Sequence, residues 1–157
     1  MRILTVVCLL SASSLWAAEP DGKLGPNDWP GWRGPLHSGV SSDKAAPVRW
    51  SASQNILWKT AIPGRGHSSP TVVGSLVVLQ TADEKRQTQS VVAFDRSTGK
   101  RLWQTQLNRG GFPERINRKN THASSTVAGD GVRFFAVALH HDSIHVTALA
   151  PKDGAVL

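Results

Sequence analysis

Two histidines are the first candidates for chemistry, because each precedes a similar stretch of serine and β-branched residues. They are His67 and His122. If the two stretches are equivalent inner strands, both imidazoles point towards one centre, where they could contact a cofactor or a metal ion. Repetition without function offers a simpler interpretation, in which each histidine hydrogen-bonds its own sheet. We favour the simpler interpretation and keep the pair as candidates for cofactor binding only.

A second group of residues with metal-ligand side chains lies near the end of the chain: His140, His141, Asp142 and His145. His141 and His145 are four positions apart, a spacing that brings two ligands together on a helix. The surrounding residues predict strand, turn and strand, where this spacing does not converge. We therefore predict a solvated hairpin tip and no metal site.

Nucleophilic catalysis has little support in the sequence. No Gly-x-Ser-x-Gly elbow surrounds the candidate serines, and their strand-start hydroxyls are expected to bond backbone groups. These serines are Ser68, Ser69, Ser124 and Ser125. The glycine spacing matches neither a phosphate loop nor a dinucleotide fingerprint. We predict no catalytic residue.

The loop over residues 108–121 is the strongest candidate for binding. It carries four cations, Arg109, Arg115, Arg118 and Lys119, and long loops on a rigid scaffold often hold binding residues. These cations could contact an acidic partner, although a merely solvated insertion explains them equally well. The loop lacks the aromatic interleaving of nucleic-acid surfaces, so nucleic acid is not an expected partner.

The elements that must position these residues are short strands. Alternating or β-branched runs predict strands over residues 55–60, 68–73, 76–81, 90–95 and 100–107, with a tight hairpin at Gly74-Ser75. Residues 67–74 align with residues 122–129, and the same offset places Ala93-Phe94 on Ala148-Leu149 and Gly99 on Gly154. Self-similarity at this period predicts repeated four-stranded sheets, or blades.

The end of the third strand and the turn after it carry a longer motif. Ala93, Asp95, Thr98, Gly99 and Trp103 fill the pattern Ala-x-Asp-x-x-Thr-Gly-x-x-x-Trp. This pattern resembles the tryptophan-docking motif of the pyrroloquinoline-quinone (PQQ)-like β-propeller repeats. The resemblance implies an all-β fold: a partial propeller of four-stranded antiparallel blades, in which these five residues form a structural docking motif. In the second copy, Ala150 stands in place of the motif Asp, and Asp153 stands in place of the motif Thr. The corresponding turn is therefore expected to be weaker or to be completed differently.

The resemblance also brings an enzymatic function into consideration. Quinoprotein dehydrogenases of this family hold PQQ with a calcium ion, and many place a disulfide of adjacent cysteines against the cofactor. The sequence has one cysteine, Cys8, and no residue matches a calcium ligand or a catalytic Asp of those enzymes. PQQ and calcium are therefore expected only if the chain is a fragment of such an oxidoreductase.

The N-terminal third lies outside the repeats. Residues 1–18 combine Arg2, an apolar run and a small-residue exit, which predicts a secretory signal peptide cleaved after Ala17 or Ala18, and hence secretion or a periplasmic location. The apolar run is too short to span a membrane. Residues 19–54 predict an extended strap, in which Trp29 and Trp32 could bind carbohydrate, although packing against the sheets is the favoured role.

The repeats fill the rest of the 157 residues. Blade strands are expected over residues 55–107 and the start of the next blade over residues 122–157, and the last motif breaks off inside a blade. We expect an N-terminal fragment whose remaining propeller blades are missing. The basic residues that give the net charge of +7 are scattered along the sequence and do not indicate a particular partner.

These observations favour one function and leave two others open. The favoured function is a secreted, non-catalytic scaffold that binds a protein or an envelope polymer, similar to the propeller component of outer-membrane assembly machinery but without its lipid-anchor cysteine. The alternatives are a fragment of a PQQ-dependent quinoprotein oxidoreductase and a carbohydrate-binding module.

Overall fold

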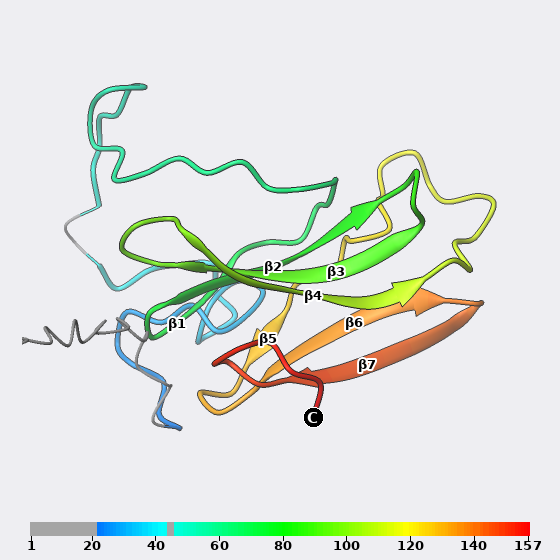
Figure 1. Ribbon diagram of the computed structural model, residues 1–157. Helices are drawn as coiled ribbons and strands as arrows, with labels where there is room; N and C mark the ends of the chain where they lie inside the picture. The colour runs from blue at the N-terminus through cyan, green and yellow to red at the C-terminus, as the bar shows by residue number, and fades with distance from the viewer. Residues whose placement is uncertain (1–21, 44–45) are drawn as a thin grey trace, which may run out of the picture.

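The computed structural model describes residues 22–43 and 46–157, and within them all regular structure is β (Figure 1). Seven strands form two antiparallel sheets, ordered β1-β2-β3-β4 and β5-β6-β7. The strands are β1 (Thr71–Val73), β2 (Leu76–Asp83), β3 (Thr88–Asp95), β4 (Arg101–Arg109), β5 (Ala128–Gly129), β6 (Phe134–His140) and β7 (Ser143–Leu149). We call the first sheet blade one and the second blade two. The predicted signal peptide lies outside the described residues.

Blade one follows the expected order of four strands. β2 and β3 are buried along most of their length, as their β-branched runs predict for strands covered on both faces. A two-residue turn joins β1 to β2, with Gly74 at a φ of 56°. β4 alternates, with Trp103, Thr105 and Leu107 turned inward and the intervening side chains exposed. This alternation is the period-two pattern of a half-buried strand.

Blade two repeats blade one, but β5 and β6 are both displaced by two residues from the offset that relates β7 to β3. Gly129 pairs with Phe134 where blade one pairs Val72 with Val77, and Asp130 donates to the Arg133 carbonyl across a turn at Gly131–Val132 that matches Gly74–Ser75. The predicted alignment of residues 67–74 with 122–129 is therefore wrong by two residues at the strand. The displacement ends at the β6–β7 turn, which is only His141–Asp142 where blade one has Glu84–Gln87.

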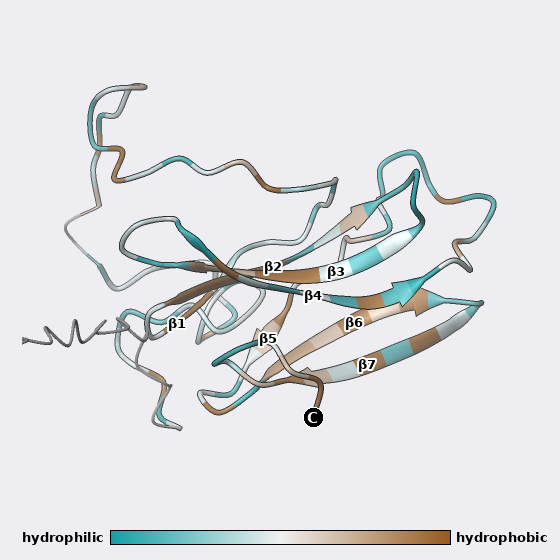
Figure 2. Ribbon diagram, in the orientation of Figure 1, coloured by the Kyte–Doolittle hydropathy of each residue, from teal (hydrophilic) through white to brown (hydrophobic). Residues whose placement is uncertain are grey.

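The main core lies between the two blades. One face of blade one, with Val78, Val91, Ala93 and Trp103, packs on Phe134 and other apolar residues of blade two. A smaller cluster of Leu79, Val92 and Phe94 lies on the opposite face of blade one. Figure 2 shows the apolar residues along β2 and β3. Stacking of the blades is thus the main source of burial.

The prediction of a strand over residues 55–60 is wrong. Among the described residues no strand pairs with this stretch, and its backbone is extended but irregular. A strand requires a hydrogen-bonding neighbour, and periodicity in the sequence cannot supply one. Trp58 and Thr60 of this stretch instead contact blade one through their side chains.

The strap crosses both blades at their inner strands. Trp29 exchanges two backbone hydrogen bonds with Val72 of β1, at 2.7 and 2.9 Å, and the Pro30 carbonyl accepts one from Gly129 of β5 at 2.8 Å. The buried Asp28 carboxylate accepts hydrogen bonds from the backbone amides of Gly25 and Gly74. The strap is therefore held by backbone pairing that its irregular sequence does not reveal.

Candidate functional site

The turn between β3 and β4 is organised by Asp95 of the docking motif. One carboxylate oxygen accepts hydrogen bonds from the amides and hydroxyls of Ser97 and Thr98, at 2.6 to 3.0 Å. Gly99 has a φ of 70° and donates its amide to the Asp95 carbonyl at 2.8 Å. This closed turn presents backbone carbonyls at its outer side.

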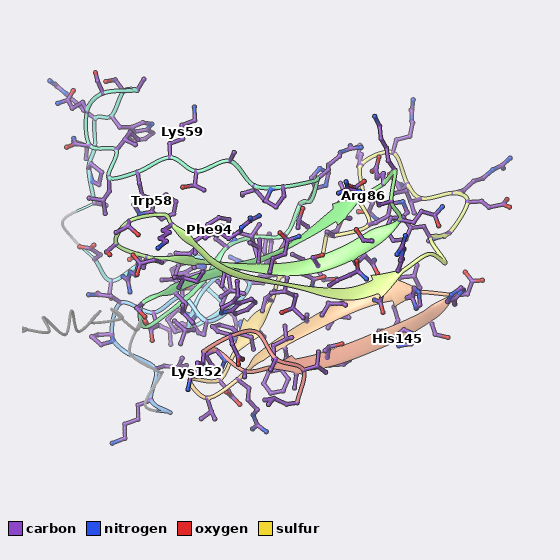
Figure 3. All side chains as sticks on the ribbon, in the orientation of Figure 1. Trp58, Lys59, Arg86, Phe94, His145 and Lys152 are labelled. Carbon is purple, nitrogen blue, oxygen red and sulfur yellow. The ribbon has the colours of Figure 1, made fainter. Side chains whose placement is uncertain are left out.

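The side chains that dock on this turn come from the preceding segment. The Trp58 indole N–H donates to the Arg96 carbonyl at 2.8 Å, and the Thr60 hydroxyl donates to the Gly99 carbonyl at 2.7 Å (Figure 3). A Cβ on Gly99 would lie 2.5 Å from the Trp58 ring. Gly99 is therefore needed both for its backbone conformation and for the space that Trp58 fills.

The same arrangement recurs between β4 and blade two. The Trp103 indole donates to the Pro151 carbonyl at 2.9 Å, and the Thr105 hydroxyl donates to the Gly154 carbonyl at 2.6 Å. The motif residue Trp103 thus docks on the turn of the following blade. Inside blade one, Trp103 pairs with the motif residue Ala93 of the neighbouring strand. Each blade is tied to the next by one indole and one hydroxyl.

The second docking turn is completed differently from the first. Ala150 supplies no carboxylate, but the backbone bonds persist, with Ala150 donating to the Ala155 carbonyl and Gly154 to the Ala150 carbonyl. Asp153 takes the place of Thr98 and accepts from the Ala155 amide at 3.0 Å. The backbone of the turn is therefore retained without the motif aspartate.

This difference predicts a pH dependence that arises at the first docking turn. Hydrogen bonds from Ser97 and then Thr98 lower the pKa of Asp95 below 3.8. A carboxyl whose pKa is depressed on folding stabilises the fold above its unfolded-state pKa, and this contribution is lost as the pH falls towards the folded-state value.

We expect Asp95→Asn to lower the free energy of unfolding at neutral pH, because the amide replaces a charged acceptor. The difference from the wild-type chain should shrink below about pH 4, where the wild-type carboxyl is protonated in the unfolded chain. Urea unfolding across this pH range measures it. A difference that stays constant with pH would contradict the assignment.

At the opposite end of the blades, the loop from Gly110 to Thr121 arches between the turns of the two sheets. Gly110 donates its amide to the Gln87 carbonyl at 2.7 Å, and His141 donates to the Gly111 carbonyl at 3.1 Å. A Cβ on Gly111 would lie 2.6 Å from the His141 ring, so the loop approaches the β6–β7 tip closely. The loop is anchored on both blades.

Two hollows lie beneath this loop and share four lining residues. The larger has a volume of about 450 Å³ and the smaller about 160 Å³. Both are lined by Pro113, Ile116, Asn120 and His122. We call the two hollows together the loop hollow, and it is the candidate site.

A buried glutamine forms the floor of this site. The Gln89 side chain donates to the His122 carbonyl at 2.7 Å and to the Leu139 carbonyl at 3.2 Å, and it accepts from the Asn108 amide at 3.0 Å. All of its polar atoms are thus bonded, and it joins β3 to the end of the loop and to β6. The floor is rigid, because a buried amide with satisfied partners is costly to displace.

The charges around the loop hollow are balanced. Arg65 pairs with Glu84 at 3.4 Å across the rim, and Arg118 and Glu114 also line the larger hollow. Of the four predicted cations, only Arg118 lines it, whereas Arg109, Arg115 and Lys119 do not. The four predicted cations therefore do not act together as one lining of the hollow.

Arg65 and Glu84 line the larger hollow although they lie outside the predicted loop in the sequence, and no local pattern marks them. Phe112 and Ile116 lie inside the predicted loop but were not among its candidate residues.

The two candidate histidines differ in their surroundings. His122 is half-buried and stacks on Phe112, with ring centroids 4.0 Å apart. His67 is exposed and lines neither part of the loop hollow. Its backbone amide, with that of Ser68, donates to the Ala123 carbonyl of the other repeat. His122 is thus part of the candidate site, whereas His67 contributes a backbone hydrogen bond between the two repeats.

The three C-terminal histidines cluster at the β6–β7 tip. The His140 ring lies 4.3 Å from His141 and 5.5 Å from His145, between centroids, and one of its ring nitrogens is 3.3 Å from the Arg109 carbonyl. Within residues 22–43 and 46–157, no group of three or more His, Cys, Asp or Glu side chains could hold a metal ion. Among the serines, Ser68 and Ser124 bond backbone groups.

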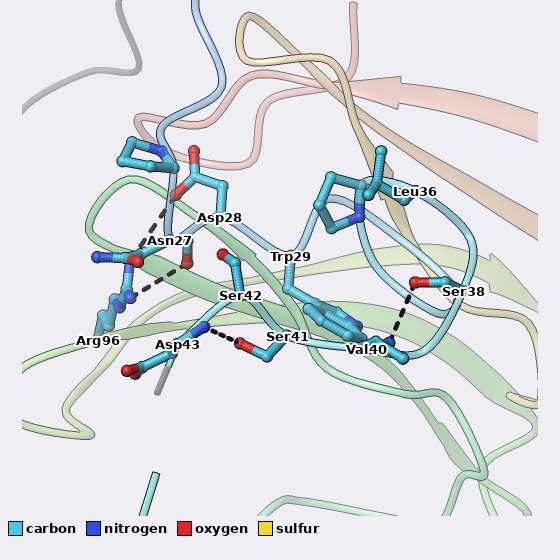
Figure 4. Close-up of a pocket in the computed structure, with 12 residues that line it drawn as sticks. Asn27, Asp28, Trp29, Leu36, Ser38, Val40, Ser41, Ser42, Asp43 and Arg96 are labelled. Atoms are coloured by element: carbon cyan, nitrogen blue, oxygen red, sulfur yellow. Dashed lines mark hydrogen bonds and ion pairs between the residues drawn. The ribbon is translucent and has the colours of Figure 1, made fainter. Parts of the chain in front are cut away.

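A third hollow, also of about 450 Å³, lies between the strap and the β3–β4 turn. Trp29 lines it, and Arg96 closes one side by donating to the Asn27 carbonyl beside the Asp28 carboxylate (Figure 4). Trp32 is 64% exposed and does not line it. The two tryptophans considered for carbohydrate binding therefore do not form one platform around this hollow.

The loop hollow does not supply the ligands that a PQQ cofactor with its calcium ion would need. Calcium requires six to eight oxygen ligands, usually with several carboxylates. The loop hollow offers Glu84 and Glu114, and Glu84 is paired with Arg65. No chemical step through this cofactor follows from the site.

A family model described as outer membrane protein assembly factor BamB matches residues 11–157. No curated protein matches the chain. In the part of the chain that the structure covers, no helix has the length and apolar character needed to cross a membrane.

Proposed function

Because the chain belongs to the PQQ-like repeat family described as outer membrane protein assembly factor BamB, we propose that it is a non-catalytic, exported scaffold whose loop hollow binds an envelope protein. Its all-β blades form part of a PQQ-like propeller. The observation that carries the proposal is the loop hollow, a concave site walled by a loop that is fixed on both blades. Secretion or a periplasmic location is part of the same proposal.

The lining of the hollow supports a polypeptide as the ligand. Phe112, Pro113 and Ile116 provide apolar contacts, while the amides of Asn117 and Asn120 can bond a peptide backbone. A polyanion would be attracted by unbalanced positive charge, but here Arg65 and Arg118 are balanced by Glu84 and Glu114. A segment with one apolar and one acidic side chain fits this combination, with the acidic group beside Arg118.

The proposal is tested by binding of a fluorescently labelled peptide with the alternating aromatic and polar residues of an outer-membrane β-strand and one central Asp. We expect saturable binding by fluorescence anisotropy. Arg118→Glu should weaken it by about tenfold, because a charge-assisted contact becomes a repulsion.

Arg115→Glu is the matched control, since it makes the same charge change in the same loop without lining the hollow. It should leave the affinity within about twofold. Equal losses in both variants would indicate general electrostatic attraction, and the proposed site would be abandoned. Absence of binding would also overturn the proposal.

The oxidoreductase alternative predicts a different result. If the chain binds PQQ, incubation with the quinone and calcium followed by gel filtration should leave the quinone's absorbance with the protein. The scaffold proposal expects the protein to elute without it.

A further inference from the structure

The hollow between the strap and the β3–β4 turn has the dimensions of a small-molecule site. Its volume of about 450 Å³ falls within the range of about 300–1,000 Å³ that is typical of ligand pockets. Strap residues between Pro26 and Asp43 form most of its lining, and Arg96 of the β3–β4 turn completes it. We call it the strap hollow. It shares no lining residue with the loop hollow, so a ligand bound here is independent of the proposed function.

The Trp29 side chain in this lining is held in a fixed orientation. The backbone of Trp29 exchanges two hydrogen bonds with Val72 of β1, at 2.7 and 2.9 Å. Its ring packs against Gly34, where a Cβ would lie 2.7 Å from the ring atoms. In Figure 4 the ring lies between Arg96 on one side and Ser38 on the other. A ring that is fixed before binding loses little conformational entropy when a ligand stacks on it.

The indole N–H of Trp29 is an unused hydrogen-bond donor. The two docking tryptophans donate theirs to carbonyls, Trp58 to Arg96 at 2.8 Å and Trp103 to Pro151 at 2.9 Å. Trp29 is also half-buried, yet its indole N–H donates to no group of the described residues. Because a buried tryptophan N–H usually has a partner, this donor is available to a ligand beside the ring.

Groups that donate and accept hydrogen bonds surround this ring. The hydroxyl oxygens of Ser38 and Ser41 accept from the amides of Val40 and Asp43 at 3.2 and 3.1 Å, so each hydroxyl proton can still be donated. Arg96 donates two of its five N–H groups to backbone carbonyls, which leaves others for a ligand. Between these polar groups the lining is apolar, with two prolines, a leucine and a valine.

The charges of the lining disfavour a charged ligand. The lining contains one cation, Arg96, and two carboxylates, Asp28 and Asp43. Asp28 already accepts hydrogen bonds from two backbone amides and lies 3.8 Å from Arg96. An anion would meet an excess of carboxylates. A cation held by aromatic rings would find only Trp29 among the described lining residues.

We propose that the strap hollow binds an uncharged saccharide, with one sugar ring stacked on Trp29. A pyranose presents C–H groups on its faces and hydroxyl groups around its rim. The C–H face fits the indole ring and the apolar lining, while the rim hydroxyls can accept from the indole N–H and exchange hydrogen bonds with Ser38 and Ser41. Trp32 is 64% exposed and outside the lining, so the site depends on one tryptophan and its polar surroundings.

An array of immobilised neutral and anionic glycans, probed with the labelled chain at physiological salt, tests this proposal. We expect binding to at least one neutral glycan, whose soluble form is then titrated by calorimetry. Trp29→Phe should weaken this binding by at least about tenfold, because it keeps an aromatic ring but removes the indole N–H. Trp32→Phe is the matched control and should leave the affinity within about twofold.

Tryptophan fluorescence and a second variant give independent readouts. The glycan should change the emission of the wild-type chain and of Trp32→Phe, but not that of Trp29→Phe. Ser41→Ala, at an exposed position where the fold should be unaffected, should weaken binding by about fivefold. Binding to no neutral glycan, binding confined to anionic glycans, or equal losses in the two phenylalanine variants would overturn the proposal.

Discussion

Replacing Trp103 with alanine is expected to lower the free energy of unfolding by about 3–5 kcal/mol. The ring is buried in the core between the blades, and its indole N–H bonds the Pro151 carbonyl. The substitution removes the apolar burial and leaves that carbonyl without its donor. It also removes one of the two side chains through which β4 holds the second docking turn.

Urea unfolding monitored by circular dichroism measures this loss, and Trp50→Ala is the matched control. Trp50 is 69% exposed and is not part of either hydrophobic cluster. Its removal should change the free energy by no more than about 0.5 kcal/mol. Similar losses for both tryptophans would show that Trp103 has no special role in joining the blades.

Gly154→Ala should have the second largest effect. Gly154 has a φ of 72°, which costs a residue with a Cβ about 1–2 kcal/mol. The added Cβ would also lie 2.5 Å from the Trp103 ring and 2.5 Å from the Thr105 hydroxyl. Displacing these groups should add about 1–3 kcal/mol.

Gly110 separates the two contributions. It has the same φ of 72°, but a Cβ there would meet nothing within 4 Å. Gly110→Ala therefore reports the cost of the backbone conformation alone. If Gly154→Ala and Gly110→Ala destabilise the chain equally, the close approach of Trp103 to the second turn contributes nothing.

These variants can be studied apart from binding, because the docking turns and the loop hollow lie at opposite ends of the sheets (Figure 1). The β3–β4 turn and the turn after β7 are at one end, and the loop from Gly110 to Thr121 is at the other. A variant at a docking turn should lower the stability of the fold more than it lowers the affinity for the peptide. Arg118→Glu should lower the affinity more than the stability.

Local patterns in the sequence were sufficient to predict blade one. β2 and β3 each contain a short apolar run with two adjacent valines, and the turn at Asp95 is fixed by residues within a few positions of each other. The offset between His67 and His122 correctly identified the repeat. These features depend on neighbours in the chain, which is why sequence reasoning reached them.

Features that depend on distant segments were missed or misplaced. Residues 55–60 have the pattern of a strand but no partner among the described residues. The displacement of β5 and β6 by two residues begins before β5 and is reversed by the short β6–β7 turn. The loop hollow was anticipated only through its loop, because the lining residues Arg65 and Glu84 are brought there by the sheet.

The central claim is that each blade is joined to the next by a tryptophan seated on a glycine turn, and a double-mutant cycle of Trp103→Ala and Gly154→Ala tests it most directly. With the ring removed, the added methyl group no longer meets it. The penalty of Gly154→Ala should then be smaller by at least about 1 kcal/mol than in the wild-type chain. A penalty that is the same in both backgrounds would contradict the account.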